Sequence, residues 1–163
     1  MEPRLNYGKV LPEGMRPIYA LDRYSANSGL EPSLLELVKL RASQLNGCAY
    51  CVDMHSKDAR TRGETEQRLY GLTVWRETPY YTERERAALA LTEAVTLIAD
   101  NHVPAEVYEQ ARQQFSEEEL VKLMIAIVII NTWNRFAITF GDVPGSYQPN
   151  HFATAPAPME LSR

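Results

Sequence analysis

The segment from residue 117 to residue 140 constrains the fold most, because it has the length and pattern of one long helix. Its centre reads Met-Ile-Ala-Ile-Val-Ile-Ile over residues 124–130, so a helix here is apolar on every side and should be buried all round. β-branched residues also suit strands, but the length and the capping-box pattern Ser116-x-x-Glu119 favour a helix. This apolar centre is far too short to span a bilayer.

The rest of the chain is also patterned as helices. Two further capping-box patterns, Ser33-x-x-Glu36 and Thr82-x-x-Glu85, each precede an apolar-periodic stretch. The second stretch predicts an amphipathic helix from Glu83 to about Asp100, carried by a row of apolar side chains at helical spacing: Ala87, Leu91, Ala94, Leu97 and Ile98. We therefore expect an all-α fold.

Two shorter helices and a tail complete the predicted organisation. Pro104 suits the first turn of a helix that runs to about Gln114, and a weaker pattern predicts a helix from Glu13 to about Tyr24. With 163 residues the chain is most simply one domain, which we place at residues 1–143. The proline-rich remainder, residues 144–163, reads as an extended tail, either mobile or laid on a neighbouring subunit.

A short internal repeat suggests that the helical unit is duplicated. The pentapeptide Glu-Leu-Val-Lys-Leu occurs at residues 36–40 and again at residues 119–123, each time with a serine three residues before its glutamate. The same register aligns three further pairs of positions: Cys48 with Asn131, Tyr50 with Trp133, and Cys51 with Asn134. The second copy therefore lacks the thiols of the first.

Charge and composition exclude several classes of protein. The net charge is −4, and no cluster of Lys or Arg offers a nucleic-acid footprint. The N-terminus opens no apolar signal-peptide core. We therefore expect a cytoplasmic protein with neither a nucleic-acid partner nor a membrane. An all-round apolar helix in a chain with few other helices to cover it further predicts a homo-oligomer, with part of residues 120–130 or their neighbours at the interface.

Both cysteines lie in the stretch Asn-Gly-Cys-Ala-Tyr-Cys-Val-Asp-Met-His, residues 46–55. Asn-Gly readily adopts left-handed conformations and ends helices, so a new helix is expected from about Cys48 to Arg62. Cys48, Cys51 and His55 then share one face of it. The helix start lowers the pKa of a thiol at Cys48 and suggests that this cysteine is the more accessible one. His55 can accept a proton from Cys51.

Other interpretations of these residues remain open. Cys48, Cys51 and His55 could be three zinc ligands, but a closed site needs a fourth. Only His102, His151 and carboxylates remain, none at a convincing spacing. A structural disulfide is disfavoured in a reducing compartment, where a lone C-x-x-C is more often reactive or metal-binding.

The spacing Glu36-x11-Cys48-x2-Cys51-x3-His55 resembles the core motif of the AhpD-like alkylhydroperoxidases, in the carboxymuconolactone decarboxylase superfamily. Residues 37–47 and 131–135 add to the likeness, which extends from about residue 4 to residue 141. The resemblance implies an all-α fold with a duplicated helical unit, and trimers or hexamers. It also implies a reductase of small hydroperoxides that binds no cofactor. An external dithiol donor, dihydrolipoamide-like on a lipoyl partner or thioredoxin-like, would recharge it.

The resemblance also implies a role for each residue of the site. Cys51 is the thiol that attacks the peroxide, and Cys48 resolves it as a redox-active disulfide. His55 assists deprotonation of Cys51, and Glu36 relays protons as well as capping its helix. Tyr50 is a possible accessory residue, because the best-known peroxidases of the family carry a histidine there. Two other interpretations remain: a non-catalytic redox-sensing or binding oligomer, and a zinc-stabilised structural protein.

Overall fold

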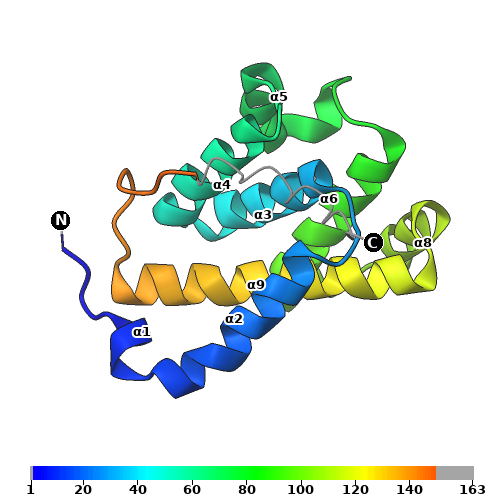
Figure 1. The fold of residues 1–163 in the computed structure, drawn as a ribbon. Coiled ribbons are helices and arrows are strands. Elements are labelled where there is room, and N and C mark those ends of the chain that lie inside the picture. The colour runs from blue at the N-terminus through cyan, green and yellow to red at the C-terminus, as the bar shows by residue number, and fades with distance from the viewer. Residues whose placement is uncertain (1, 150–163) are drawn as a thin grey trace, which may run out of the picture.

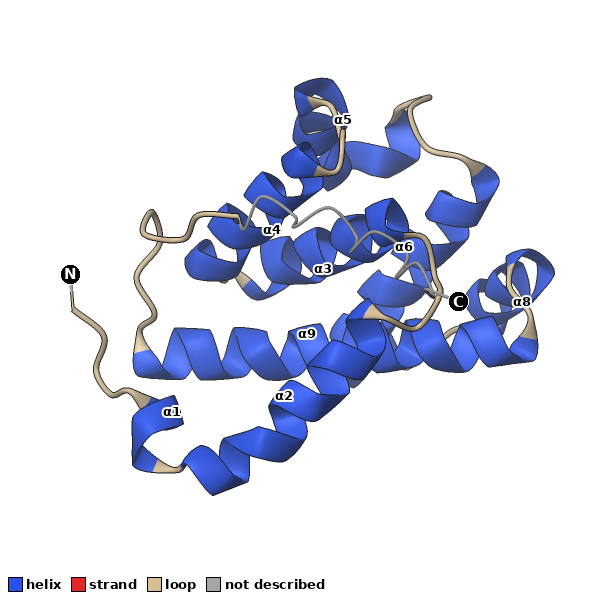
Figure 2. Ribbon diagram, viewed as in Figure 1, coloured by secondary structure: helices blue, strands red, loops and turns tan. Residues whose placement is uncertain are grey.

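The computed structural model describes residues 2–149; residue 1 and residues 150–163 lie outside the described part. Within residues 2–149 every regular element is a helix and no strand occurs (Figure 2), which confirms the predicted all-α fold. In chain order the elements are α1 (Tyr7–Val10), α2 (Pro12–Ala26), α3 (Pro32–Asn46), α4 (Ala49–Thr61), α5 (Glu66–Gly71), the 3-10 helix η1 (Leu72–Glu77), α6 (Glu83–Thr96), α7 (Ile98–Asn101), α8 (Ala105–Gln114) and α9 (Glu117–Phe140).

Helix α9 is the longest helix, and five other helices pack along it (Figure 1). It has the predicted bounds and the predicted capping box. The Ser116 hydroxyl accepts the Glu119 N–H, and the Glu119 carboxylate accepts the Ser116 N–H at 2.8 Å. Helices α2, α3, α4, α6 and α8 all contact α9, so it forms one wall of the core throughout its length.

One face of α9 differs from the prediction that the helix is buried all round. Leu123 and Ile127 are fully buried, but Val121, Met124 and Val128 are 62, 38 and 42% exposed. The neighbouring helices cover only part of the α9 surface and leave this apolar stripe on the outside. By length and composition alone α9 could also cross a membrane. Its contacts with five other helices are those of a core helix.

Helix α3 lies at the centre of the core, in contact with α4, α6 and α9. The predicted capping box at Ser33 and Glu36 is wrong. The helix begins earlier, at Pro32, with Glu31 at the cap position and no side-chain cap hydrogen bond. Glu36 therefore lies beyond the first turn, and it is buried at 3% exposure. The two copies of the repeated pentapeptide lie on α3 and α9, which pack against each other, but only the second copy carries the shared cap.

Helix α6 starts as predicted and ends early. The capping box between Thr82 and Glu85 is present, but the helix stops at Thr96. Leu97 leaves helical geometry at φ −100° and ψ 32°, and the short α7 follows. Leu97 and Ile98 are 42 and 48% exposed. Of the apolar row that predicted a helix to about residue 100, Ala87 and Leu91 are buried in the core, whereas Leu97 and Ile98 are not. Helix α8 has the predicted bounds.

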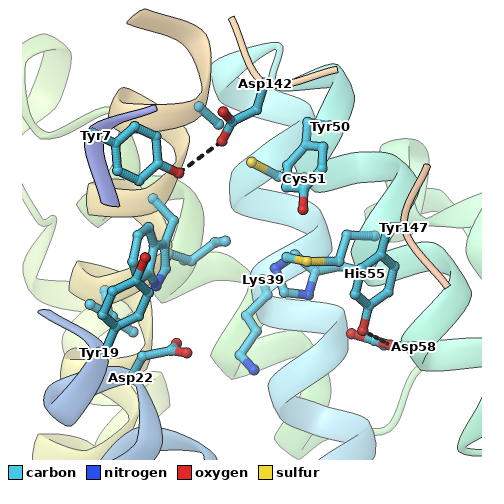
Figure 3. Close-up of a pocket in the computed structure, with 15 residues that line it drawn as sticks. Tyr7, Tyr19, Asp22, Lys39, Tyr50, Cys51, His55, Asp58, Asp142 and Tyr147 are labelled. Carbon is cyan, nitrogen blue, oxygen red and sulfur yellow. Dashed lines mark hydrogen bonds between the residues drawn. The ribbon is translucent and has the colours of Figure 1, made fainter. Parts of the chain in front are cut away.

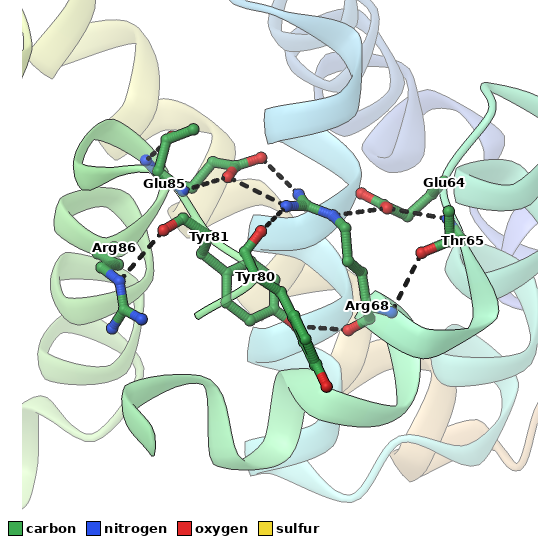
Figure 4. Close-up of polar contacts among 8 residues, drawn as sticks. Glu64, Thr65, Arg68, Tyr80, Tyr81, Glu85 and Arg86 are labelled. Atoms are coloured by element: carbon green, nitrogen blue, oxygen red, sulfur yellow. Dashed lines mark hydrogen bonds and ion pairs between the residues drawn. The ribbon is translucent and has the colours of Figure 1, made fainter. Parts of the chain in front are cut away.

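Arg68 ties α5 to the start of α6 (Figure 4). Its guanidinium donates to Glu64 at 2.8 Å and to Glu85 at 2.6 Å, and its backbone carbonyl accepts the Tyr81 hydroxyl. Burial raises the pKa of Tyr81 to about 12, which keeps this hydroxyl protonated as a donor. This network holds α5 against the first turn of α6 and the residues just before it.

The chain beyond α9 turns back over its own α4 (Figure 1). The Gly145 N–H donates to Asp53 at 3.0 Å, and the Lys57 ammonium donates to the carbonyl of Tyr147 at 2.9 Å. Gly145 and Tyr147 of the predicted tail therefore contact α4 of their own chain. Residues 150–163 of the tail fall outside the described residues, and the domain boundary at residue 143 stays a prediction.

Candidate functional site

The site begins at the turn between α3 and α4. Gly47 adopts a left-handed conformation at φ 69°, which glycine takes without steric cost. Cys48 follows as the N-terminal cap of α4, and its sulfur accepts the Cys51 N–H at 3.3 Å. The break at Gly47 and the new helix after it are as predicted, and they place the thiols at a helix start.

Two asparagines of α9 hold this turn in place. The side-chain amide of Asn46 donates to the side-chain oxygens of Asn131 at 3.0 Å and Asn134 at 2.8 Å. Asn134, which is fully buried, donates in turn to the Ser43 hydroxyl at 3.0 Å. The repeat aligned these asparagines with the cysteines. In the structure they fix the start of α4 against the core.

Cys48 and Cys51 are joined in a disulfide, with their Cα atoms 5.3 Å apart. Both are 1% exposed and pack with Ala137 and Tyr50. The expectation that Cys48 is the accessible cysteine is therefore wrong, because α9 covers it. Since each sulfur is bonded to the other, neither is a thiolate available to zinc in this oxidised state.

Cys51 lines a pocket of about 400 Å³, and Cys48 does not. In Figure 3, Tyr7, Tyr19 and Asp22 face Cys51 and His55 across this space. The lining mixes aromatic, apolar and charged side chains from α1, α2, α3, α4, α9 and the segment after α9: Tyr7, Tyr19, Asp22, Lys39, Tyr50, Cys51, Met54, His55, Asp58, Ile129, Ile130, Trp133, Ala137, Asp142 and Tyr147. A volume of this size suits an organic molecule.

Glu36 is buried behind the pocket wall and pairs with His55, which lines the pocket. Nδ1 of His55 lies 2.9 Å from Oε2 of Glu36. Burial alone would raise the pKa of Glu36, but the hydrogen bond to His55 and the charges of Lys39 and Arg62 outweigh it and lower the pKa. An ionised carboxylate only accepts hydrogen bonds, so Nδ1 carries the proton. In the neutral form of the ring Nε2 is then the basic nitrogen, and this is the form that deprotonation of Cys51 requires.

A second carboxylate, Asp58, lies beside this pair. The ligand-type atoms of Glu36, His55 and Asp58 all lie within 4.8 Å of one another, an arrangement that could approach a metal ion. However, the Lys39 ammonium and the Arg62 guanidinium already approach Glu36 at 3.4 and 3.8 Å. Because these cations neutralise the site, it fits proton transfer better than metal binding.

Of the predicted site residues, the structure brings Glu36, Cys48, Cys51 and His55 together, and Tyr50 lies on the pocket wall. Burial raises the pKa of Tyr50, and its accessory role stays a prediction. Sequence analysis missed the other residues that line the pocket. A helical signal existed for Asp58, which follows His55 by three positions on the same face of α4. No local pattern marked Tyr7 or Tyr147, which approach from the two ends of the chain.

Residues 12–94 match the sequence profile of the carboxymuconolactone decarboxylase family. A Bacillus subtilis protein, YdfG, is 44% identical over 142 residues, which is 87% of this chain and 97% of YdfG. The chain belongs to the carboxymuconolactone decarboxylase family. This confirms the superfamily that the motif indicated. YdfG itself is uncharacterised.

Solved structures agree with this assignment. A protein of unknown function from Agrobacterium tumefaciens, ATU0492, provisionally described as the antioxidant defence protein AhpD, is 47% identical. It superposes with a TM-score of 0.86 over 90% of this chain and 100% of its own. An AhpD-core, peroxidase-related protein from Ralstonia eutropha shares the fold at 22% identity, with a TM-score of 0.72 over 83% and 72% of the two chains. The chain therefore has the AhpD-like fold.

Proposed function

We propose that the protein is a thiol-dependent hydroperoxide reductase that cycles between a Cys48–Cys51 dithiol and disulfide. One observation carries the proposal: Cys51 lines a pocket together with His55, and Glu36 orients the imidazole from behind. A thiol beside an oriented base is the arrangement of an activated nucleophile. Membership of the family and the likeness to ATU0492 add support.

In the first half of the cycle, Nε2 of His55 takes the proton of the Cys51 thiol. The thiolate attacks the terminal oxygen of the hydroperoxide, and the O–O bond breaks. The alkoxide that leaves takes the proton held by His55 and departs as an alcohol, while Cys51 becomes a sulfenic acid. The Cys48 thiol then attacks the Cys51 sulfur. The S–O bond breaks, water leaves with the Cys48 proton, and the disulfide forms.

An external dithiol resets the cycle. One donor thiol attacks the disulfide, and the second attacks the resulting mixed disulfide. The donor is thereby oxidised and both cysteines return to thiols. Since Cys51 lines the pocket and Cys48 is covered, we assign the first attack by the donor to Cys51.

The pocket also bears on the substrate and partners. Its apolar and aromatic lining, which includes Met54, Ile129 and Trp133, suits the organic group of an alkyl hydroperoxide. The donor is a dihydrolipoamide-like dithiol or a thioredoxin-like protein, and the setting is the reducing cytoplasm. A homo-oligomer, either trimer or hexamer, belongs to the same proposal.

Peroxide consumption by the reduced protein in the presence of dihydrolipoamide tests this function. We expect multiple turnovers that are abolished by Cys51→Ser. Oxidation that stops after one equivalent, whichever dithiol is supplied, would instead identify a non-catalytic redox sensor. Stoichiometric zinc in the purified protein would identify a zinc-stabilised structural protein and would rule out the dithiol cycle.

A further inference from the structure

Asp58 is the carboxylate of the Glu36–His55–Asp58 cluster that lines the pocket, as His55 also does. Glu36 is buried behind the pocket wall and does not line the cavity, whereas Asp58 does. Asp58 also lies in the cluster whose members are within 4.8 Å of one another. A donor thiol in the pocket therefore meets a carboxylate acceptor on the cavity wall, close to the imidazole of His55.

Tyr147, in the segment after α9, forms a hydrogen bond with this carboxylate. Its hydroxyl donates to Oδ1 of Asp58 at 2.8 Å (Figure 3), and its own segment is fastened to α4 through Lys57 and Asp53. Burial and the hydrogen bond to Asp58 raise the pKa of Tyr147. The hydroxyl therefore remains a donor at neutral pH, and a donor to a carboxylate favours its charged form.

The charges that face Asp58 oppose one another. Burial and the negative charge of Glu36 raise its pKa, while the hydrogen bond from Tyr147 and the positive side chains lower it. The groups that act on Asp58 come from α3, from α4 and from the segment after α9: Glu36, Lys39, His55 and Tyr147. Arg62 lies near the same cluster because it approaches Glu36. The negative charge of Asp58 in turn raises the pKa of Tyr50. Burial is the largest of the effects on Asp58, and the net result is a pKa of Asp58 above its ordinary value. Loss of the Tyr147 hydroxyl would therefore raise the pKa of Asp58 further.

We propose that Asp58, held ionised by the Tyr147 hydroxyl, is the positioning carboxylate that exchanges protons between the pocket and His55. The inference rests on the proposed dithiol cycle but not on the identity of the oxidant. During reduction, the proton of the attacking donor thiol passes to Asp58 and through His55 to the cysteine thiolate that is released. Each of the two donor protons thus ends on a cysteine, and the donor becomes a disulfide.

The chain offers a matched control. The Tyr7 hydroxyl also donates to an aspartate, Asp142, at 2.8 Å, and also lines the pocket. However, it belongs to α1 and lies on the opposite side of the cavity from His55 (Figure 3). Tyr7→Phe and Tyr147→Phe therefore remove equivalent hydroxyls from the same pocket, and only the second one touches the proposed route.

The experiment follows reduction of the disulfide by dihydrolipoamide across a range of pH, without peroxide. The ionisation of the donor is common to all variants and cancels in the ratio of each rate constant to that of the parent protein. Without its hydroxyl partner the pKa of Asp58 rises, so the Tyr147→Phe ratio should be close to one at high pH. It should fall about tenfold in acid for each unit of pKa shift. The Tyr7→Phe ratio should stay flat.

Asp58→Asn provides a second test that leaves Tyr147 in place. We expect it to reduce the rate constant roughly a hundredfold at pH values where Asp58 is ionised in the parent protein, the usual loss for a proton-transfer group. A Tyr147→Phe ratio as flat as that of Tyr7→Phe, or an Asp58→Asn protein reduced at the parent rate, would overturn the inference. If the parent disulfide is reduced but peroxide does not reoxidise it, the proposed peroxidase function fails, while this half-reaction still tests Asp58 and Tyr147.

Discussion

Nδ1 of His55 lies 2.9 Å from Oε2 of Glu36, although the two residues are 19 positions apart. The contact exists because α3 runs to Gly47, the chain reverses there, and α4 returns along it. The stretch from Glu36 to His55 therefore forms a helical hairpin, and the spacing of the motif sets how far the two helices run beside each other. The hairpin brings a carboxylate to the imidazole that serves Cys51.

Glu36→Gln should reduce peroxide turnover about a hundredfold or more, because glutamine does not hold a proton on Nδ1 of His55 with a full negative charge. It should also lower the free energy of unfolding, since the negative charge that Lys39 and Arg62 approach is removed. The measurement is kcat/KM for an alkyl hydroperoxide alongside urea unfolding.

Glu119→Gln is the control at the matching position of the repeat. Glu119 forms a capping box and an ion pair with Arg84, far along α9 from the thiols. Since glutamine also serves in a capping box, the substitution should cost at most about 1 kcal/mol of stability and leave turnover at the parent level. Equal turnover in the Glu36→Gln and parent proteins would contradict a role for Glu36 in proton transfer.

Acid should destabilise the protein partly through Glu93. Burial alone would raise its pKa, but hydrogen bonds from Trp75, Arg76 and Arg41 outweigh it and lower the pKa below the ordinary 4.5. A carboxylate with a lower pKa in the folded state stabilises the fold fully above its unfolded pKa. That contribution is lost as pH falls through the folded pKa. The parent should therefore lose stability from just above pH 4.5 downward.

Glu93→Gln tests this contribution by urea unfolding at about pH 7 and about pH 4. We expect a cost on the order of 2 kcal/mol at neutral pH and a smaller cost in acid. Glu109→Gln is the comparison, because Glu109 pairs with Arg112 on an exposed surface, where ion pairs contribute little. A Glu93→Gln cost that is the same at both pH values would contradict the assignment.

The exposed stripe of α9 predicts self-association. Val121, Met124 and Val128 form a contiguous apolar face, and such faces mark interaction surfaces. Sedimentation of the parent protein at micromolar concentration should show a closed oligomer, and Val128→Glu should shift it toward monomer. Val74→Glu places the same charge at an exposed site on η1 and should leave the assembly intact. A parent protein that sediments as a stable monomer would refute the prediction.

Much of the fold could be predicted from local signals. The bounds of α8 and α9, the break at Gly47 and two of the three capping boxes follow from caps, apolar spacing and turn residues, which act within a few positions of the chain. The failures came where tertiary structure decided. Helix α3 begins at Pro32, earlier than predicted, so Glu36 lies in the core instead of at a capping position. Leu97 is exposed instead of packed in the core, and α6 ends one residue before it.

Only the part of the site that lies on α3, α4 and the turn between them could be predicted. Glu36, Cys48, Cys51 and His55 lie on one hairpin, so their spacing sufficed. Burial of Cys48 could not be predicted, because Ala137 of α9 covers the disulfide from the far end of the sequence. Tyr7 and Tyr147 reach the pocket from opposite ends of the chain, and no periodicity records a contact of that range.

The oxidation of Cys51 by a hydroperoxide tests the account most directly. Reduced Cys48→Ser protein is mixed with an alkyl hydroperoxide, and a sulfenic-acid probe and peptide mapping locate the product. We predict rapid labelling of Cys51, because it lines the pocket beside His55 and no thiol remains to resolve it. Cys51→Ser protein should leave Cys48 unlabelled under the same conditions. Labelling at Cys48 with none at Cys51, or no labelling of either protein, would contradict the account.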